Sequence, residues 1–277
     1  MQAAIVAAFA AAVSAPATAG GLIQDPAALK RRFAALVAGS YSGQACDEIP
    51  DRDGKGNHPG RLQISPTGQV QLDAVRMDMF APNMEVGMGR HAGKEDRMEF
   101  ELVEGSQRHA MLNSTDEGPA KGFIEMGAAP DGHGNVTEGR MCADLDLRAM
   151  PLLAASNPLA DLMAEAYDTG GQTVRGECKN LGRKRNGQRV GGESRQASYS
   201  VGRLAVVLNG QALPLHDKAR PLTYVTVGSR LADGTLNGSF EWAGDANFHL
   251  EQFMGATGQV ASFSFSEGEA KWFCKPK

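Results

Sequence analysis

The sequence RMEFEL, residues 97–102, alternates charged and apolar side chains without interruption. Successive side chains of a β-strand point to opposite faces, so this period of two predicts a strand with one buried face and one face in water. Phe263 and Phe265 alternate with serines in the same manner near the far end of the chain. The pattern indicates a mainly β protein of the α+β class.

Short runs of the same kind lie on both sides of this strand, separated by turn sequences such as Pro-Thr-Gly, Asp-Gly and Asn-Gly. We expect strands over residues 60–66, 69–76, 84–91, 107–115, 119–127, 203–208, 222–231, 235–242 and 245–254, and a hairpin formed by 262–266 and 271–274. Each half of the chain would hold about six to eight antiparallel strands, which tend to curl or close into a barrel because closure removes exposed edges.

The four cysteines are spaced as two equal pairs. Cys46 and Cys142 lie 96 residues apart, as do Cys178 and Cys274, and the second pair follows the first at an offset of 132. So long a period predicts two tandem copies of one domain, since the repeats of solenoids run to about 20–50 residues. Four cysteines allow three pairings, and only Cys46–Cys142 with Cys178–Cys274 treats both copies alike. Zinc is the competing use, but it favours close pairs such as C-x-x-C, which the sequence lacks.

Two further matches favour an internal duplication. Asp25-Pro26 matches Asn157-Pro158, and each pair places an N-cap residue and a proline at the start of a predicted helix. GRLQISPTGQ at residues 60–69 resembles GRLAVVLNGQ at residues 202–211. We therefore expect one domain over residues 20–147, a connector over 148–156 and a second domain over 157–277. Each domain would be an N-terminal helix followed by a sheet closed by one disulfide.

The amino terminus resembles a signal for export. Residues 1–19 carry no charge, are apolar from Ala3 to Val13 and end in Ala17-Thr18-Ala19, a small-x-small cleavage pattern, although a positively charged n-region is missing. An even number of widely spaced cysteines is typical of oxidising compartments. These features predict a periplasmic or secreted protein, with no transmembrane segment in the mature chain.

The charge distribution argues against a nucleic-acid partner. The formal net charge is −4, and 6% of the residues are aromatic. Residues 25–156 carry 14 Lys and Arg against 20 Asp and Glu, whereas residues 157–277 carry 14 against 12. Neither half has the basic excess, nor the aromatic platforms, that nucleic-acid binding uses.

A methionine-rich stretch is the one candidate metal site. Its thioethers and imidazole suit Cu(I), but methionine is also a common filler of hydrophobic cores, which is the interpretation we favour. The residues concerned are Met77, Met79, Met84, Met88 and His91.

The densest charge run, between Lys179 and Arg195, is basic. Such a composition is typical of a flexible solvated loop, and it also suits docking to an acidic protein or anionic surface. The candidate partner-binding residues are Arg183, Lys184, Arg185 and Arg189.

Sequence signatures of enzymes are missing: the chain has no G-x-S-x-G, S-x-x-K, H-E-x-x-H or P-loop motif. No cofactor is predicted. We expect a non-catalytic exported protein that binds another protein of the cell envelope or exterior, as an inhibitor, a toxin-neutralising protein or an adaptor. The alternative is a carrier of a lipid or another apolar small molecule, with methionines lining its cavity. Periplasmic copper binding and a hydrolase are further alternatives.

Overall fold

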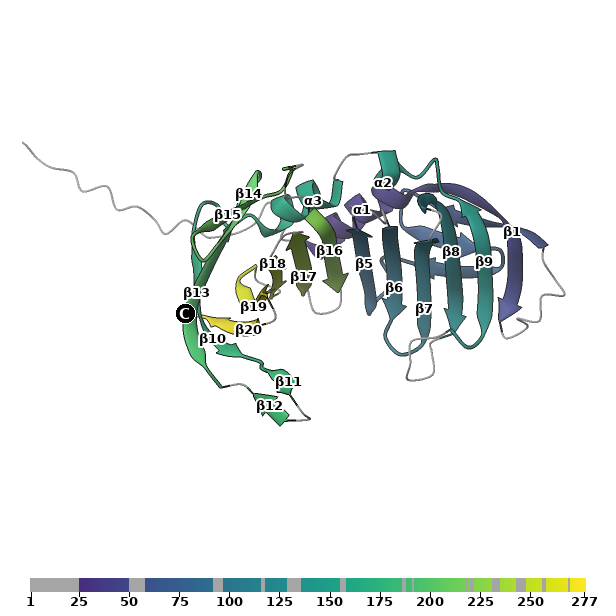
Figure 1. Cartoon of the computed structure of the whole chain (residues 1–277). Coiled ribbons are helices and arrows are strands. Elements are labelled where there is room, and N and C mark those ends of the chain that lie inside the picture. The colour runs from purple at the N-terminus through teal and green to yellow at the C-terminus, as the bar shows by residue number, and fades with distance from the viewer. Residues whose placement is uncertain are drawn as a thin grey trace, which may run out of the picture.

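The computed structural model describes 25–49, 58–91, 97–115, 118–128, 136–154, 158–185, 188–190, 192–217, 219, 222–230, 235–242, 248–255, 258–268 and 270–277. The predicted signal peptide, residues 1–19, lies outside these ranges. The described chain is mainly antiparallel β-sheet, with three helices lying along one side of it (Figure 1).

Within its described residues, the first half of the chain contains helix α1 (Pro26–Val37) and nine strands. These strands are β1 (Gly39–Ile49), β2 (His58–Ile64), β3 (Gln69–Leu72), β4 (Val75–Asp78), β5 (Met84–His91), β6 (Arg97–Glu104), β7 (Arg108–Thr115), β8 (Gly118–Ala128) and β9 (Gly139–Asp146). Helix α2 (Pro151–Ala154) falls within the predicted connector, and its Leu152 is buried.

The second half begins with helix α3 (Pro158–Tyr167) and continues as strands. Those in the main sheet are β10 (Val174–Asn180), β13 (Ser194–Val201), β14 (Ala205–Leu208), β15 (Gln211–Pro214), β16 (Leu222–Arg230), β17 (Leu236–Trp242), β18 (Phe248–Met254), β19 (Val260–Glu267) and β20 (Ala270–Pro276). A separate hairpin consists of β11 (Arg183–Arg185) and β12 (Gln188–Val190).

Apart from β11 and β12, the strands of both halves form one antiparallel sheet rather than two. Their order is β4-β3-β2-β1-β9-β8-β7-β6-β5-β16-β17-β18-β19-β20-β10-β13-β14-β15. The expectation of a separate, closed sheet in each half is therefore wrong. Strand β5 pairs with β16, so the sheet is continuous across the two halves, and β4 and β15 are its edges among the described strands.

Both edges are short, which limits their pairing with other chains. Each edge also contacts a distant strand of its own half, which shows how strongly the sheet curls. Arg108 donates from Nη2 to the carbonyl of Arg76 in β4. Trp242 donates from Nε1 to the carbonyl of Pro214 in β15 over 2.9 Å. The sheet therefore curls without closing into a barrel.

The strand order is the same in both halves when followed outward from the β5–β16 seam. The sequence matches agree with this order only in part. GRLQISPTGQ runs from β2 through the following turn to the first residue of β3, whereas GRLAVVLNGQ begins in the turn before β14. These segments do not occupy equivalent places, so the internal duplication stays a prediction.

Helix α1 begins where the sequence predicts. The side chain of Asp25 accepts a hydrogen bond from the Ala27 amide over 2.9 Å, and Pro26 occupies the first helical turn. Leu29 and Phe33 on its apolar face are fully buried. An ion pair between Arg32 and Glu165 joins α1 to α3.

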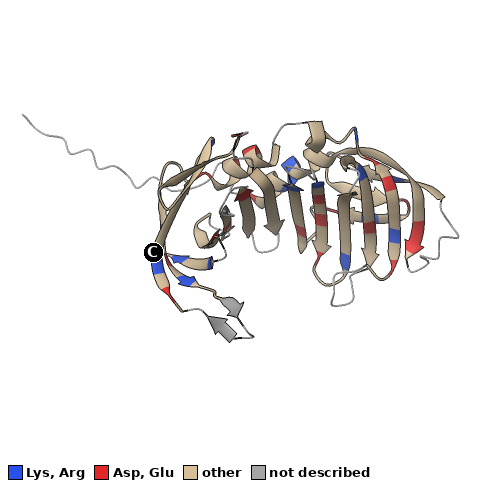
Figure 2. Cartoon of the chain, viewed as in Figure 1, with Lys and Arg blue, Asp and Glu red and all other residues tan. Residues whose placement is uncertain are grey.

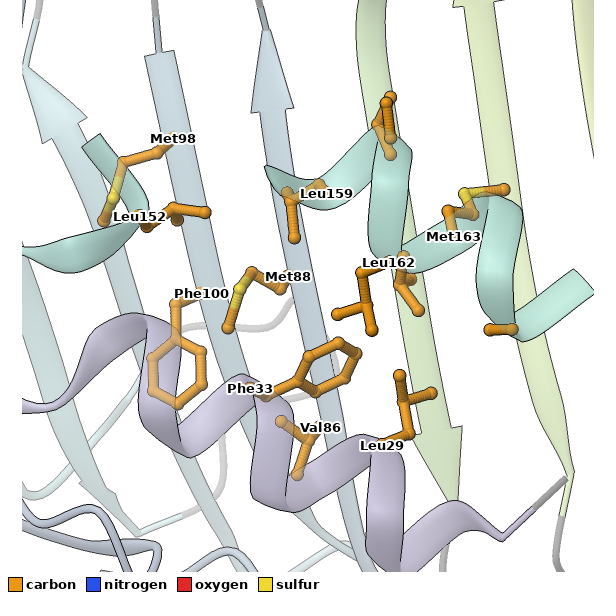
Figure 3. Packing of buried hydrophobic residues seen from close by; sticks show 14 of the residues in the cluster. Leu29, Phe33, Val86, Met88, Met98, Phe100, Leu152, Leu159, Leu162 and Met163 are labelled. Atoms are coloured by element: carbon orange, nitrogen blue, oxygen red, sulfur yellow. The ribbon is translucent and has the colours of Figure 1, made fainter. Parts of the chain in front are cut away.

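One hydrophobic core runs through both halves. Figure 3 shows Phe33 of α1 packing towards Val86 and Met88 of β5, close to Leu162 of α3. The two helices cross the same face of the sheet at the seam. Burial of this apolar surface stabilises the association of the two halves, together with the pairing of β5 and β16.

Both predicted disulfides are present, as Cys46–Cys142 and Cys178–Cys274. Each joins residues directly opposite one another on adjacent strands, β1 with β9 and β10 with β20. The bonds therefore crosslink neighbouring strands inside the sheet and do not close a barrel, contrary to expectation.

Candidate functional site

A groove of about 410 Å³ lies on the outer face of the sheet at the β5–β16 seam. Side chains alternate along a strand, and Val86 and Met88 point inwards to the helices, so Gly87 faces outwards beneath this groove. The groove is lined by Glu85, Val86, Gly87, Met88, Glu99, Glu101, Val103, Thr226, Val227, Gly228, Ser229, Thr235, Asn237 and Phe253.

The floor is built from rows of outward-facing residues that cross four strands, β6, β5, β16 and β17. The central row reads Glu101, Gly87, Gly228, Asn237, because these residues are consecutive cross-strand partners. The neighbouring row reads Glu99, Gly89, Thr226, Ser239, and its two hydroxyl groups are 2.7 Å apart. Two facing glycines leave the middle of the central row without side chains.

Polar side chains lie over the glycines of both rows. The Glu99 side chain occupies the place that a Cβ on Gly89 would take, and the Asn237 side chain does the same over Gly228. Gly87 differs, because a Cβ there would have 3.8 Å to its nearest neighbour, Oε2 of Glu101. Side-chain oxygens of Glu99, Glu101 and Asn237 thus lie over the three glycines of the groove floor, Gly89, Gly87 and Gly228.

Glu99 and Glu101 of β6 are each held by a partner from another strand, Tyr224 of β16 and His109 of β7. Tyr224 donates its hydroxyl to Oε1 of Glu99. Burial and this carboxylate raise the pKa of Tyr224 well above its ordinary value, which keeps the phenol protonated as a donor. Oε1 of Glu101 lies 2.8 Å from Nε2 of His109, whose ring is buried.

The described lining of the groove is acidic. Its lining contains three glutamates and, among the described residues, no lysine, arginine or histidine. Figure 2 marks the acidic bands on the central strands β5 and β6. The arrangement offers preorganised hydrogen-bond acceptors, which suits binding of a cationic group.

A second polar cluster lies beside the groove, on β17 and β18. Nδ1 of His249 is 2.9 Å from Oε1 of Glu241, and Nε2 is 4.0 Å from Oε2 of Glu251. Burial alone lowers the pKa of His249, but hydrogen bonds to the two carboxylates outweigh it and raise the pKa to about 9. The hydrogen bond to His249 in turn lowers the pKa of Glu251.

This cluster predicts a pH-dependent stability. Because the pKa of His249 is raised from 6.5 to about 9 on folding, its stabilising effect is complete below pH 6.5 and is lost as the pH rises through 9. We expect the free energy of unfolding, measured by urea denaturation, to fall over this window. His249→Gln should flatten that part of the profile, whereas His58→Gln, at an exposed position, should leave it unchanged. An unchanged profile in His249→Gln would contradict this assignment.

The methionines of the candidate copper site lie in the core. Met77, Met79, Met84 and Met88 are each at most 2% exposed. They come from β4, the turn after it and β5, and they pack within the main hydrophobic cluster. His91 ends β5, and its side chain lies outside the described part of the chain. The arrangement fits the interpretation of these methionines as core fillers.

The basic segment forms a hairpin where a flexible loop was expected. Arg183 pairs with Val190, Lys184 with Arg189, and Arg185 with Gln188. The side chains of this hairpin lie outside the described structure, so the docking role of its basic residues stays a prediction. Nearby, Arg195 belongs to the main sheet and stacks on Trp272 at 4.2 Å while pairing with Glu267 at 2.7 Å.

The groove residues were missed by sequence reasoning. The alternation in residues 97–102 does place Glu99 and Glu101 on the outer face. No local signal, however, shows that Gly87 lies opposite Gly228, since that pairing joins the two halves.

No group of three or more His, Cys, Asp or Glu suited to a metal occurs within the described residues. In the same part of the chain, no helix has the length and apolar character needed to cross a membrane. A scan against protein-family models gave no match, and a search of curated proteins found no similar sequence.

Proposed function

We propose that this protein is an exported, non-catalytic binding protein that captures another protein on the outer face of its sheet. The observation that carries the proposal is the groove at the β5–β16 seam, which is open, lined by both polar and apolar side chains, and built on central strands. Positions on central strands are held by hydrogen bonds on both sides, so the groove presents its acceptors in a fixed geometry. Rigid presentation lowers the entropy cost of binding.

The filled interior favours this function over carriage of an apolar ligand. A carrier holds its ligand in a cavity of about 300 Å³ or more. Behind the sheet, the corresponding space is occupied by buried side chains from both halves and the helices. Fully buried examples at the seam are Phe33, Met84 and Leu159. The polar face therefore offers the better binding surface.

The proposed location is the periplasm or the exterior. The two disulfides support it, because oxidising compartments preserve such bonds. An inhibitor, a toxin-neutralising protein or an adaptor would all use a rigid exported surface of this kind.

Site-specific photo-crosslinking tests the proposal. We would place p-benzoylphenylalanine at Val103, which lines the groove, and at Leu204, which is 79% exposed in the turn before β14. After irradiation in the native compartment, we expect a discrete protein adduct from position 103 and none of the same mass from position 204. Equal adducts from both positions, or none from 103, would contradict capture at the groove.

A further inference from the structure

We infer that the groove binds an arginine side chain from an extended segment of the partner protein, with its guanidinium group over Gly87. This inference rests on the proposed function and specifies the chemistry of its partner. The side-chain oxygens around the floor carry the argument. Oε2 of Glu101 lies over Gly87, the Glu99 carboxylate covers Gly89, and the Asn237 side chain covers Gly228.

A guanidinium group matches this set of acceptors. It carries five N–H donors in a planar fork and no acceptor, and it pairs well with carboxylates. Two of the converging groups are carboxylates, and the third is an amide whose oxygen faces the floor. The described lining supplies no basic side chain of its own. A positive charge on the ligand would pair with the carboxylates of Glu99 and Glu101.

Gly87 supplies an independent argument. Glycine weakens the interior of a strand, and it often marks a place where a ligand approaches the backbone closely. Gly89 and Gly228 are explained by the side chains that lie over them. A Cβ on Gly87 would meet nothing closer than 3.8 Å, so packing within the protein does not require glycine there. An occupant close to the backbone would account for the glycine at this position.

The acceptors are already oriented without a ligand. His109 holds Oε1 of Glu101, which leaves Oε2 at the floor, and Tyr224 holds Glu99 in the neighbouring row. His109 and Tyr224 are positioning residues in this scheme. Val103 and Phe253 also line the groove and provide apolar surface for the aliphatic stem of an arginine.

A peptide pair tests the inference. The probe is a capped pentapeptide of sequence GRGRG, and its control has both arginines replaced by citrulline, which keeps the shape and removes the charge. Isothermal titration at low ionic strength should show binding of the arginine peptide at least about tenfold tighter, because charge-assisted hydrogen bonds are the stronger kind. Equal binding of both peptides would overturn the inference.

Variants of the protein locate the binding. Gly87→Val fills the floor with a residue that favours strands, and Glu101→Gln removes charge while it keeps a hydrogen-bonding side chain. Each should weaken the arginine peptide about tenfold with an unchanged melting temperature. Glu48→Gln, at an exposed glutamate of β1, is the matched control and should bind like the parent. Full binding by Gly87→Val would place the peptide elsewhere and overturn the inference.

Two further results separate this inference from the proposed function. If free arginine amide binds as tightly as the pentapeptide, the groove takes a small cation and the extended segment is wrong. If the position-103 crosslink to a partner persists in Gly87→Val while peptide binding is absent from the parent, protein capture stands and the arginine inference fails.

Discussion

Replacing Cys46 and Cys142 together by alanine is expected to lower the free energy of unfolding by about 4–5 kcal/mol, the loss of loop entropy for a crosslink spanning roughly 100 residues. The bond joins residues 96 apart in sequence, and both cysteines are buried. Urea denaturation of the parent and the double variant measures the difference. The Cys178→Ala, Cys274→Ala variant spans an equal separation and should lose a similar amount.

The reduced parent protein is the control for this experiment. If the effect arises from the crosslinks, a reductant should destabilise the parent by about the combined loss of the two double variants, because it opens both bonds, and it should leave a variant with all four cysteines replaced by alanine unchanged. A loss below about 1 kcal/mol in both double variants would mean that the sheet alone holds these strands, since removal of a disulfide typically costs about 2–5 kcal/mol.

The second large effect is expected at Phe33, where Phe33→Ala should cost about 3–5 kcal/mol because it leaves a cavity in the core. Phe33 is fully buried between α1, β5 and α3 (Figure 3). Its neighbours come from both halves of the chain. Calorimetry should therefore show a single unfolding transition in the parent, and Phe33→Ala should shift the whole of it to lower temperature.

Leu36→Ala is the matched control on the same helix. Leu36 is only partly buried against the core, so its removal should cost less. Two separate transitions in the parent, of which Phe33→Ala moves only one, would show that the halves unfold independently despite their common sheet.

Local features of the fold were predictable because short-range physics decides them. Alternation in residues 97–102 corresponds to strand β6, and Asp25-Pro26 corresponds to the start of α1. The disulfide pairing followed from equal spacing of the cysteines. Turns were harder to predict: a single strand was expected over residues 69–76, but Asp73, with φ of 49°, breaks it into β3 and β4.

The sequence by itself determined the alternating strands such as β6, the starts of α1 and α3 and the disulfide partners, since each depends on neighbouring residues or on spacing along the chain. It did not predict the ranges of β9 or β13. Only the tertiary structure decided that β5 pairs with β16, because either strand offers the same backbone hydrogen bonds to any partner edge. That choice merges two expected sheets into one. It also sets Gly87 opposite Gly228 and brings Glu101 and Asn237 to either side of them. The groove could not be predicted from the sequence, because it forms only when β5 pairs with β16, and neither strand contains a local signal for the other.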